Sequence, residues 1–260
     1  MNVEDRMKNN IKEADKVLIG LGNELDVDFD KWNATHYPDR MQLPEWTNGY
    51  LQLLALQMGA AKQQKMAFDK IKEQIEGKDF YIVSLGMDDA VFQTFSQDEP
   101  IVTPCGGLRS LQCQQGCCKE LWPVENSGFK VMEMLRKDRL TEAELMELEK
   151  DRPHCPNCGG VLAFNNLYTD HYLEEGYLTQ WGEYKKWLQG TVNRSICIIE
   201  LGVGMRFPSI IRFAFDKLAY YNQKSIFYRV HESLYQHTSE NAQRGISVRK
   251  NALEFLLQDF

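Results

Sequence analysis

The stretch Lys16-Val-Leu-Ile-Gly20-Leu-Gly22 is an apolar run that ends in two glycines, and it sets the expected fold. Three further apolar runs follow it, at residues 80–84, 195–199 and 225–229. Continuous apolar runs, unlike alternating ones, are typical of strands that are covered on both faces, as in a parallel sheet between helices. The sequence therefore predicts an α/β protein with a Rossmann-like parallel sheet and helices on both faces.

Helical spacing fills the gaps between these runs. Apolar residues at positions 51, 54, 58 and 61, and again at 68, 71 and 75, recur every three or four residues. That rhythm predicts an amphipathic helix or helix pair, with breaks at Gly59 and Gly77. A further helix is expected to begin at Pro208, because proline suits the first helical turn.

Composition narrows the class of protein. The chain has 260 residues, of which 43% are hydrophobic and 26% charged, and its net charge is −7. An acidic balance argues against nucleic acid and against membrane as partners, since both require a cationic face. No apolar run approaches the ~20 residues that span a bilayer. Residues 1–10 are polar, unlike a signal peptide. We therefore expect a cytoplasmic protein.

The cysteines carry the sharpest chemical signal. Six of the seven lie between Cys105 and Cys158, in a chain with no sign of secretion. Clustered cysteines in a reducing compartment indicate a metal before disulfides. The motif Cys155-Pro-Asn-Cys158-Gly-Gly aims two thiolates at one centre and has the form of half a structural zinc site.

The other half of the zinc site must come from the cysteines near residue 115. Cys113 can pair with Cys117 or with Cys118, since both spacings suit a zinc knuckle. We expect Cys117 in preference to its neighbour. Four thiolates would close the coordination sphere, so this zinc would stabilise folding and leave no position for a reacting water. Reduced core and surface cysteines, or a redox pair, are the alternative.

The middle of the chain differs from its flanks. Residues 105–165 have little strand signal, and Thr141-Glu-Ala-Glu144 has the form of a capping box that opens a helix. We interpret residues 105–165 as a small zinc-binding module inserted into a discontinuous nucleotide-binding domain formed by residues 1–104 and 166–260.

Glycines at strand ends are candidate ligand contacts. Gly20 and Gly22 follow the first run, and Gly202 and Gly204 follow the third. Such glycines place backbone N–H groups at a sheet edge, where a phosphate is stabilised. A tight turn that needs positive φ is the alternative. Glu24 opposes a phosphate there, so its side chain must point away or the ligand is not a dinucleotide.

The order of these features resembles that of the sirtuins, the NAD-dependent deacylases and ADP-ribosyltransferases. The closest stretches are Cys105-Gly-Gly-Leu-Arg-Ser-Leu-Gln-Cys113 and Cys155-Pro-Asn-Cys158-Gly-Gly-Val-Leu162. The family has a His-Gly-Ser segment eight residues before its first zinc cysteine, and a second Cys-x-x-Cys followed by Gly-Gly. The resemblance covers most of residues 15–232 and implies NAD and zinc as cofactors.

The chain departs from the sirtuin pattern at several sites. The family's Gly-Ala-Gly-Ile-Ser corresponds to Gly20-Leu-Gly22-Asn-Glu24, and its Thr-Gln-Asn-x-Asp to Ser84-Leu-Gly86-Met-Asp88. The catalytic histidine falls on Cys105, and the Gly-Thr-Ser loop falls near Leu201-Gly-Val-Gly204. A thiol with a pKa of ~8.5 is a poor substitute for that proton acceptor, so a catalytic Cys105 implies altered chemistry, and a small buried residue is the alternative.

The resemblance implies a set of sites and partners. NAD or an ADP-ribose-type nucleotide would contact seven residues, and an acyl-lysine protein would be the second substrate. Asp88 would hold the nicotinamide amide, although a helix start explains an acid there equally well. The expected enzyme is a deacylase or ADP-ribosyltransferase with altered catalysis, and the alternatives are an inactive nucleotide binder and a zinc-stapled interaction module. The expected nucleotide contacts are Gly20, Gly22, Asn23, Ser84, Asp88, Gly202 and Gly204.

Overall fold

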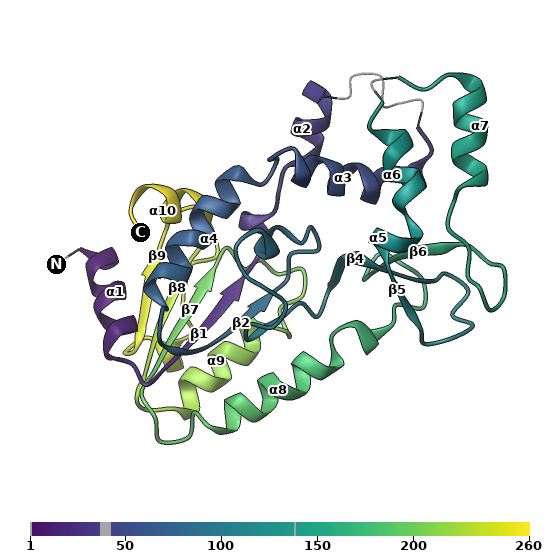
Figure 1. The fold of residues 1–260 in the computed structure, drawn as a ribbon. Helices are drawn as coiled ribbons and strands as arrows, with labels where there is room; N and C mark the ends of the chain where they lie inside the picture. The colour runs from purple at the N-terminus through teal and green to yellow at the C-terminus, as the bar shows by residue number, and fades with distance from the viewer. Residues whose placement is uncertain (1, 37–42, 138) are drawn as a thin grey trace.

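The structure, a computed structural model, describes residues 2–36, 43–137 and 139–260. The described chain forms a large sheet domain and a smaller lobe that projects from one end of it (Figure 1). None of the helices in these residues has the length and apolar composition needed to cross a bilayer.

A parallel sheet is the centre of the large domain. Its order in the described residues is β3-β2-β1-β7-β8-β9, and each neighbouring pair is parallel. The order runs outward in both directions from β1 and β7, so the topological switch point lies between these two strands. The strands are β1 (Lys16–Leu21), β2 (Asp79–Ser84), β3 (Ile101–Val102), β7 (Ile196–Leu201), β8 (Ser225–Val230) and β9 (Gly245–Val248).

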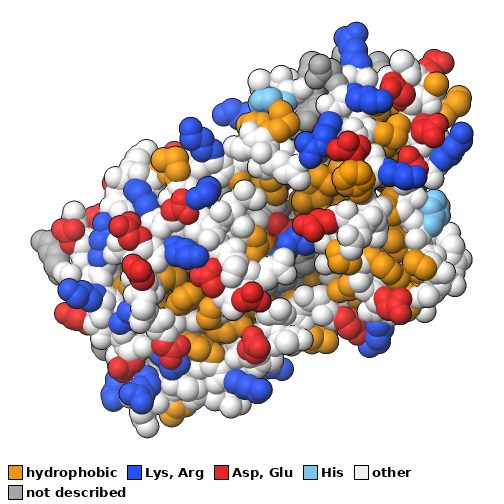
Figure 2. Space-filling view, in the orientation of Figure 1, with side chains coloured by type: hydrophobic (Ala, Val, Ile, Leu, Met, Phe, Trp, Pro, Cys, Tyr) orange, Lys and Arg blue, Asp and Glu red, His pale blue; other side chains and the backbone are white. Residues whose placement is uncertain are grey.

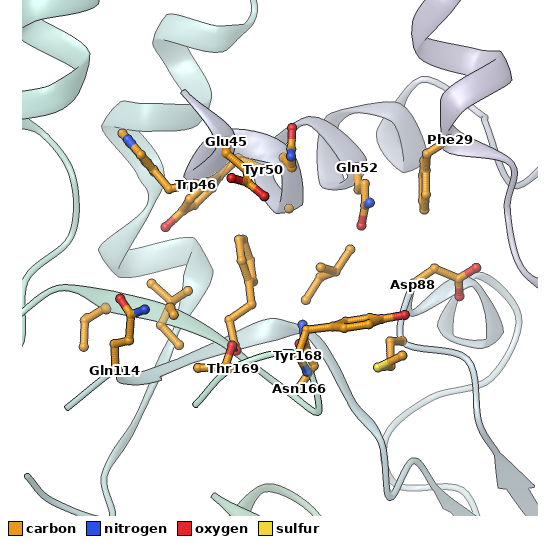
Figure 3. Close-up of a pocket in the computed structure, with 18 of the residues that line it drawn as sticks. Phe29, Glu45, Trp46, Tyr50, Gln52, Asp88, Gln114, Asn166, Tyr168 and Thr169 are labelled. Carbon is orange, nitrogen blue, oxygen red and sulfur yellow. Dashed lines mark hydrogen bonds between the residues drawn. The ribbon is translucent and has the colours of Figure 1, made fainter. Parts of the chain in front are cut away.

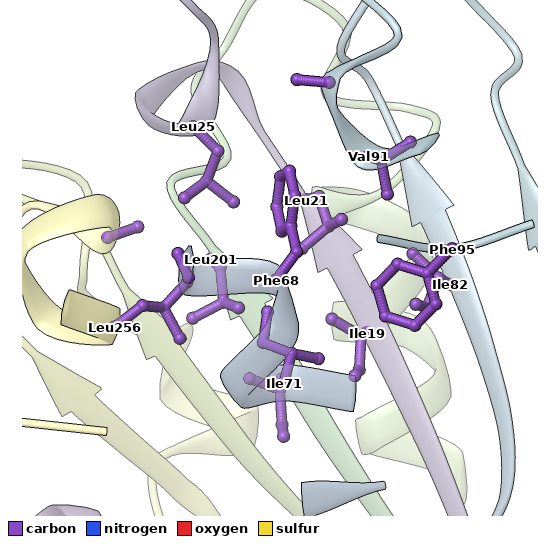
Figure 4. Close-up of a cluster of buried hydrophobic side chains, with 14 of the residues drawn as sticks. Ile19, Leu21, Leu25, Phe68, Ile71, Ile82, Val91, Phe95, Leu201 and Leu256 are labelled. Carbon is purple, nitrogen blue, oxygen red and sulfur yellow. The ribbon is translucent and has the colours of Figure 1, made fainter. Parts of the chain in front are cut away.

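Helices cover both faces of this sheet, as the sequence predicts. One face packs against α1 (Val3–Glu13), α4 (Lys62–Gln74) and α10 (Ala252–Gln258), and the other against α8 (Leu178–Gln189) and α9 (Arg212–Tyr221). Figure 4 shows the first interface, where Phe68 and Ile71 of α4 meet Ile19 of β1 and Ile82 of β2. Each buried side chain of this size stabilises the fold by about 1.5–3 kcal/mol.

The smaller lobe has its own sheet and core. An antiparallel sheet joins β4 (Gly106–Cys113) to β5 (Leu121–Pro123) and β6 (Leu162–Asn166). Its apolar cluster also includes residues 50, 51 and 54 of α3 (Asn48–Gln57), which lie far from the lobe in sequence. The remaining elements here are α5 (Val124–Ser127), α6 (Phe129–Leu135) and α7 (Glu142–Lys150), and the short helices elsewhere are α2 (Phe29–His36), η1 (Asn23–Leu25), η3 (Glu45–Thr47), η4 (Ala90–Gln93), η5 (Glu174–Gly176) and η6 (Ser239–Asn241).

Local signals in the sequence are confirmed in most places. Thr141 and Glu144 form the capping box that begins α7. Gly59 and Gly77 adopt positive φ after α3 and α4. The expectation of a helix beginning at Pro208 is wrong by four residues: α9 begins at Arg212. The intervening residues form turns, although the Phe213 N–H donates to the Pro208 carbonyl. The boundaries of the inserted module stay a prediction.

Candidate nucleotide cavity and cysteine cluster

Four cysteines of the small lobe converge as the sequence predicts. The sulfurs of Cys113, Cys117, Cys155 and Cys158 all lie within 4.8 Å of one another. Cys113 Sγ is 3.6 Å from Cys158 Sγ, and Cys117 Sγ is 3.5 Å from Cys155 Sγ, so all four thiols are free. Sulfurs at ~2.3 Å from a tetrahedral zinc ion would be ~3.8 Å apart. The cluster therefore has the dimensions of a structural zinc site.

Backbone turns hold the second cysteine pair in place. The Cys155 N–H donates to the Gly160 carbonyl at 2.6 Å, and the Gly159 N–H donates to the Cys155 carbonyl at 2.9 Å. Gly159 has a φ of +73°, which favours glycine. The Gly160 N–H approaches Cys158 Sγ at 3.4 Å. Among the described residues, the sulfur of Cys117, and not that of Cys118, groups with the other three, which agrees with the preference for Cys117, and its role as a zinc ligand stays a prediction.

A cavity lies between the sheet and the lobe. Its volume is about 830 Å³, within the range of small-molecule sites. The loops that follow β1, β2 and β7 contribute Asp26, Asp88 and Arg206, so the cavity opens at the carboxyl ends of the central strands. Open parallel sheets bind ligands at this position, beside the switch point. Figure 2 shows the hollowed surface between the two parts of the molecule.

Two segments that are distant in sequence form the walls of the cavity. Glu45, Trp46, Tyr50 and Gln52 line it from η3 and α3, and residues 162–164, 166, 168 and 169 line it from β6 and the turn beyond (Figure 3). The lining therefore mixes aromatic rings with amides and a few charges, a mixture that suits an amphipathic ligand with a flat ring. No motif in the sequence pointed to these wall residues.

Carboxyl groups gather at the sheet end of the cavity. A Cβ added at Gly86 would lie 3.3 Å from Asp88 Oδ1, 3.5 Å from Asp26 Oδ1 and 3.5 Å from Ser84 Oγ, so the three side chains converge there. Asp88 also accepts the N–H groups of Val27 at 2.8 Å and Ala90 at 3.0 Å. Burial raises the pKa of Asp88 despite these two hydrogen bonds.

Asp26 is an exposed ionisable residue that lines the cavity. Its carboxyl lies close to Asp88 and Ser84, since all three side chains approach the same point beside Gly86. Desolvation, followed by the nearby Asp88 carboxylate, raises the pKa of Asp26 to about 8, against the opposing effect of Arg206. A carboxyl with such a pKa takes up and releases a proton near neutral pH.

Asp89 fixes the start of β4 against the end of β2. Its backbone is left-handed, with a φ of 58°, and its carboxylate accepts the Leu108 N–H at 2.6 Å. Arg109 Nε lies 3.4 Å from the same carboxylate. Desolvation raises the pKa of Asp89 to about 6, against the attraction of Arg109. A Cβ at Gly107 would come within 2.3 Å of Asp89 Oδ1, so only glycine permits this contact.

The glycine loops contact each other. The Gly22 N–H donates to the Leu201 carbonyl at 2.9 Å, and the Gly202 N–H donates to the Val230 carbonyl at 2.8 Å. A Cβ at Gly22 would meet the Gly202 carbonyl oxygen at 2.3 Å. The Gly204 N–H donates to Asn23 Oδ1 at 3.3 Å. These N–H groups are therefore used within the protein, and close packing alone accounts for the two loops.

The remaining predicted site residues lie in different surroundings. Gly20 is inside β1, where a Cβ would come within 2.6 Å of Ile211. Ser84 ends β2, and its Oγ accepts the Gly86 N–H at 3.2 Å. Cys105 is fully buried in the apolar cluster beneath α8 and α9, and burial raises the pKa of its thiol to about 12. Of the expected nucleotide contacts, Asp88 lines the cavity, and the roles given to these residues stay predictions.

A buried ion network supports the loop after β7. Glu200 of β7 is fully buried, 2.9 Å from Arg229 Nε on the neighbouring β8 and 3.0 Å from Arg212 of α9. Arg212 in turn donates to the carbonyls of Val203 and Leu234. The sequence holds one signal of this network. Glu200 is the single acidic residue in the apolar run 196–201, and an acidic residue is unusual in a strand that is covered on both faces.

The fold as a whole is that of the sirtuins. A Sir2 protein bound to a propionylated peptide matches with a TM-score of 0.54 at 12% identity, over 99% of this chain and 97% of that one. A complex of Sir2 with a p53 peptide and NAD⁺ gives a TM-score of 0.54 at 11% identity, over 99% and 97%. A Sir2 homologue in complex with NAD gives 0.51 at 12% identity, over 98% and 91%. The predicted resemblance is confirmed for the fold.

The sequence also has a curated relative. The chain is 21% identical over 268 residues to the "Protein ADP-ribosyltransferase" of Staphylococcus aureus (strain Mu50 / ATCC 700699), covering 93% of this chain and 82% of that protein. No model of a known protein family matches the chain. The protein is thus sirtuin-like and distantly related to an ADP-ribosyltransferase.

Proposed function

We propose that the cavity binds NAD or a related ADP-ribosyl nucleotide, and that the protein transfers ADP-ribose to an acceptor. The observation that carries this proposal is the position of the cavity at the switch point of the sheet, with Asp88 and Asp26 at its inner end. The matched structures support the ligand, since two of them hold NAD. The curated relative supports transfer of ADP-ribose over deacylation.

The acidic end of the cavity supplies the groups that such a reaction needs. Bound NAD would supply an anomeric carbon from which nicotinamide leaves. Asp88, held by two backbone N–H groups, would orient the amide of the leaving ring. Asp26 lines the cavity, and its ionised form would accept the proton of the incoming nucleophile. Desolvation and Asp88 raise its pKa to about 8, so this form becomes the major one only as the pH rises through that value.

Cys105 makes a poor proton acceptor at this site. Burial raises the pKa of its thiol to about 12, so the group stays protonated at neutral pH. A sirtuin-like deacylation would require an acceptor at that position, whereas ADP-ribosyl transfer requires one beside the incoming nucleophile. This difference favours transferase chemistry, and an acyl-lysine protein remains the second candidate substrate.

The cysteine cluster would hold a structural zinc ion that fixes the small lobe against the cavity. Thiolates bind zinc, and none of the four is needed for the reaction. Such a site requires reduced cysteines, so we place the protein in a reducing, cytoplasmic compartment. The second candidate function is a zinc-stapled protein-interaction module, which the internal use of the glycine-loop N–H groups favours.

Titration calorimetry with NAD and with ADP-ribose tests the proposal. We expect both to bind wild type, and Asp88→Asn to weaken NAD binding at least tenfold. Asp98→Asn makes the same change at an exposed residue outside the cavity and should bind like wild type. Absence of heat and of a thermal shift at millimolar ligand would reject nucleotide binding. An assay of nicotinamide release from NAD distinguishes an enzyme, which releases nicotinamide, from a protein that only binds NAD. Equal release rates in wild type and Cys105→Ala would show that Cys105 takes no part in the mechanism.

A further inference from the structure

Glu24 points away from the cavity and toward the opposite half of the sheet edge. It follows β1 directly but does not line the cavity, and 9% of its side chain is exposed. Its carboxylate bridges the segment after β8, at Glu232, and the first residue of α10, Ala252. The sequence required the Glu24 side chain to point away from any phosphate bound at the loop after β1, and the side chain does point away from the cavity.

The Glu24 carboxylate sits among donors from two other segments. Oε1 accepts the Glu232 N–H at 3.0 Å, and Oε2 accepts the Ala252 N–H at 2.8 Å. The Nδ1 atom of His231 lies 3.0 Å from Oε1, but it accepts the backbone N–H groups of the second and third residues after it, at 3.1 Å each, and so donates no hydrogen bond to Glu24. Two converging backbone N–H groups form a site for an anion, and here the protein's own carboxylate is the anion.

The location of this carboxylate matters for a dinucleotide. In doubly wound sheets each half binds one mononucleotide, and the diphosphate crosses the switch point between them. The cavity is lined from the loops after β1, β2 and β7, while the Glu24 carboxylate is bonded to the segment after β8 and to the start of α10. A Cβ at Gly202 would lie 2.6 Å from the Glu24 Cβ, so Glu24 packs against the loop after β7, beside the switch point.

We propose that Glu24 determines how much of the nucleotide the protein binds, by holding the adenylyl half of the crevice closed with its own carboxylate. This inference rests on the proposed function. A nicotinamide-bearing half enters the cavity without meeting Glu24, whereas the adenylyl phosphate of NAD must displace the carboxylate or remain outside the crevice. The charge opposes the phosphate as well, because two like charges at ~4 Å repel by about 1 kcal/mol even in water.

Binding of three nucleotides tests the two halves of the crevice separately. Nicotinamide mononucleotide probes the cavity, AMP probes the half above β8, and NAD probes both. Calorimetry on Glu24→Ala should show AMP binding that wild type lacks and a gain of at least tenfold for NAD, with nicotinamide mononucleotide unchanged. Glu232→Ala is the matched control, because it removes an exposed charge nearby and keeps the backbone N–H. It should change the NAD affinity by less than twofold.

Each result decides a different claim. If Glu24→Ala binds AMP and NAD no better than wild type, this inference is overturned, whatever nicotinamide mononucleotide does. If no variant binds nicotinamide mononucleotide or NAD, the proposed function fails, and the AMP titration still tests the role of Glu24. Glu24→Gln keeps the size of the side chain and removes its charge, so it should fold if the alanine variant does not. A smaller gain for NAD is expected from it, and no gain would count against the proposal.

Discussion

The cysteine cluster and the glycine loops are the two motifs from which the sequence predicted ligands, and they differ in what their groups do. The four sulfurs of the cluster face one another at metal-site distances. The N–H groups of Gly22, Gly202 and Gly204 are already bonded within the protein. Metal-binding side chains that converge on one point indicate a ligand. Glycines at strand ends are a weaker signal, because close packing of the backbone requires glycine as often as ligand binding does. The ligand cavity lies beside the loops and has walls of its own.

The largest effect is expected at the cysteine cluster. Cys117→Ser should lose zinc and destabilise the protein by more than about 5 kcal/mol, since zinc contributes ~10–16 kcal/mol in small zinc domains. Cys118→Ser changes the adjacent thiol, which lies outside the cluster. It should keep one zinc per chain by elemental analysis and a melting temperature near that of wild type. Zinc retained in the first variant, or lost in the second, would reject the assignment.

The buried ion network should give the next largest effect. Glu200→Ala leaves Arg229 and Arg212 without their buried partner, and such a loss costs about 3–5 kcal/mol. Glu240→Ala removes an exposed acid and should change the free energy of unfolding by less than about 0.5 kcal/mol. Urea denaturation measures both. If Glu200→Ala and Glu240→Ala unfold with the same free energy, the buried network does not stabilise the loop after β7.

If close packing explains the glycine loops, a change from glycine to alanine should destabilise the protein in the loop after β1 and stabilise it in α8. Gly22→Ala should cost about 1–3 kcal/mol, because its Cβ would meet the Gly202 carbonyl at 2.3 Å. Gly182→Ala places a methyl group in open space within α8 and should stabilise the protein by about 0.5–1 kcal/mol. Thermal unfolding gives both values. A tolerated alanine at residue 22 would leave phosphate contact as the better explanation of that glycine.

The sequence predicted the parts of the fold that depend on local pattern. The four central strands were predicted because each is an unbroken apolar run. The edge strands β3 and β9 were missed, because Ile101–Val102 and Gly245–Val248 are too short to show one. The cysteine cluster was predicted from spacing except for one member, because the spacing suits Cys117 and Cys118 equally.

The cavity could not be predicted in the same way. Its walls bring α3 next to β6, and no local pattern connects segments that are more than 100 residues apart. Glu24 illustrates the limit at a single residue. Its charge was noted from the sequence, but the direction of its side chain depends on where Glu232 and Ala252 lie.

The smallest expected effect concerns the acidic end of the cavity. Desolvation and Asp88 raise the pKa of Asp26 from 3.8 to about 8 in the folded protein. Its contribution to stability is therefore complete below pH 4 and is lost as the pH rises through about 8. NAD affinity should fall about fivefold between pH 7 and pH 9, because the ionised carboxyl repels phosphate by about 1 kcal/mol. Calorimetry on Asp26→Asn should show no such fall, and Asp28→Asn, exposed and outside the cavity lining, should behave like wild type. A fall of the same size in Asp26→Asn would assign the titration to another group.

The central claim is that the cavity beside the switch point binds an ADP-ribosyl nucleotide. A crystal structure grown with millimolar NAD tests it most directly. The account predicts density for a nicotinamide ring and ribose between Asp88 and the walls formed by α3 and β6. An empty cavity at saturating NAD, or a nucleotide bound anywhere else on the molecule, would contradict it.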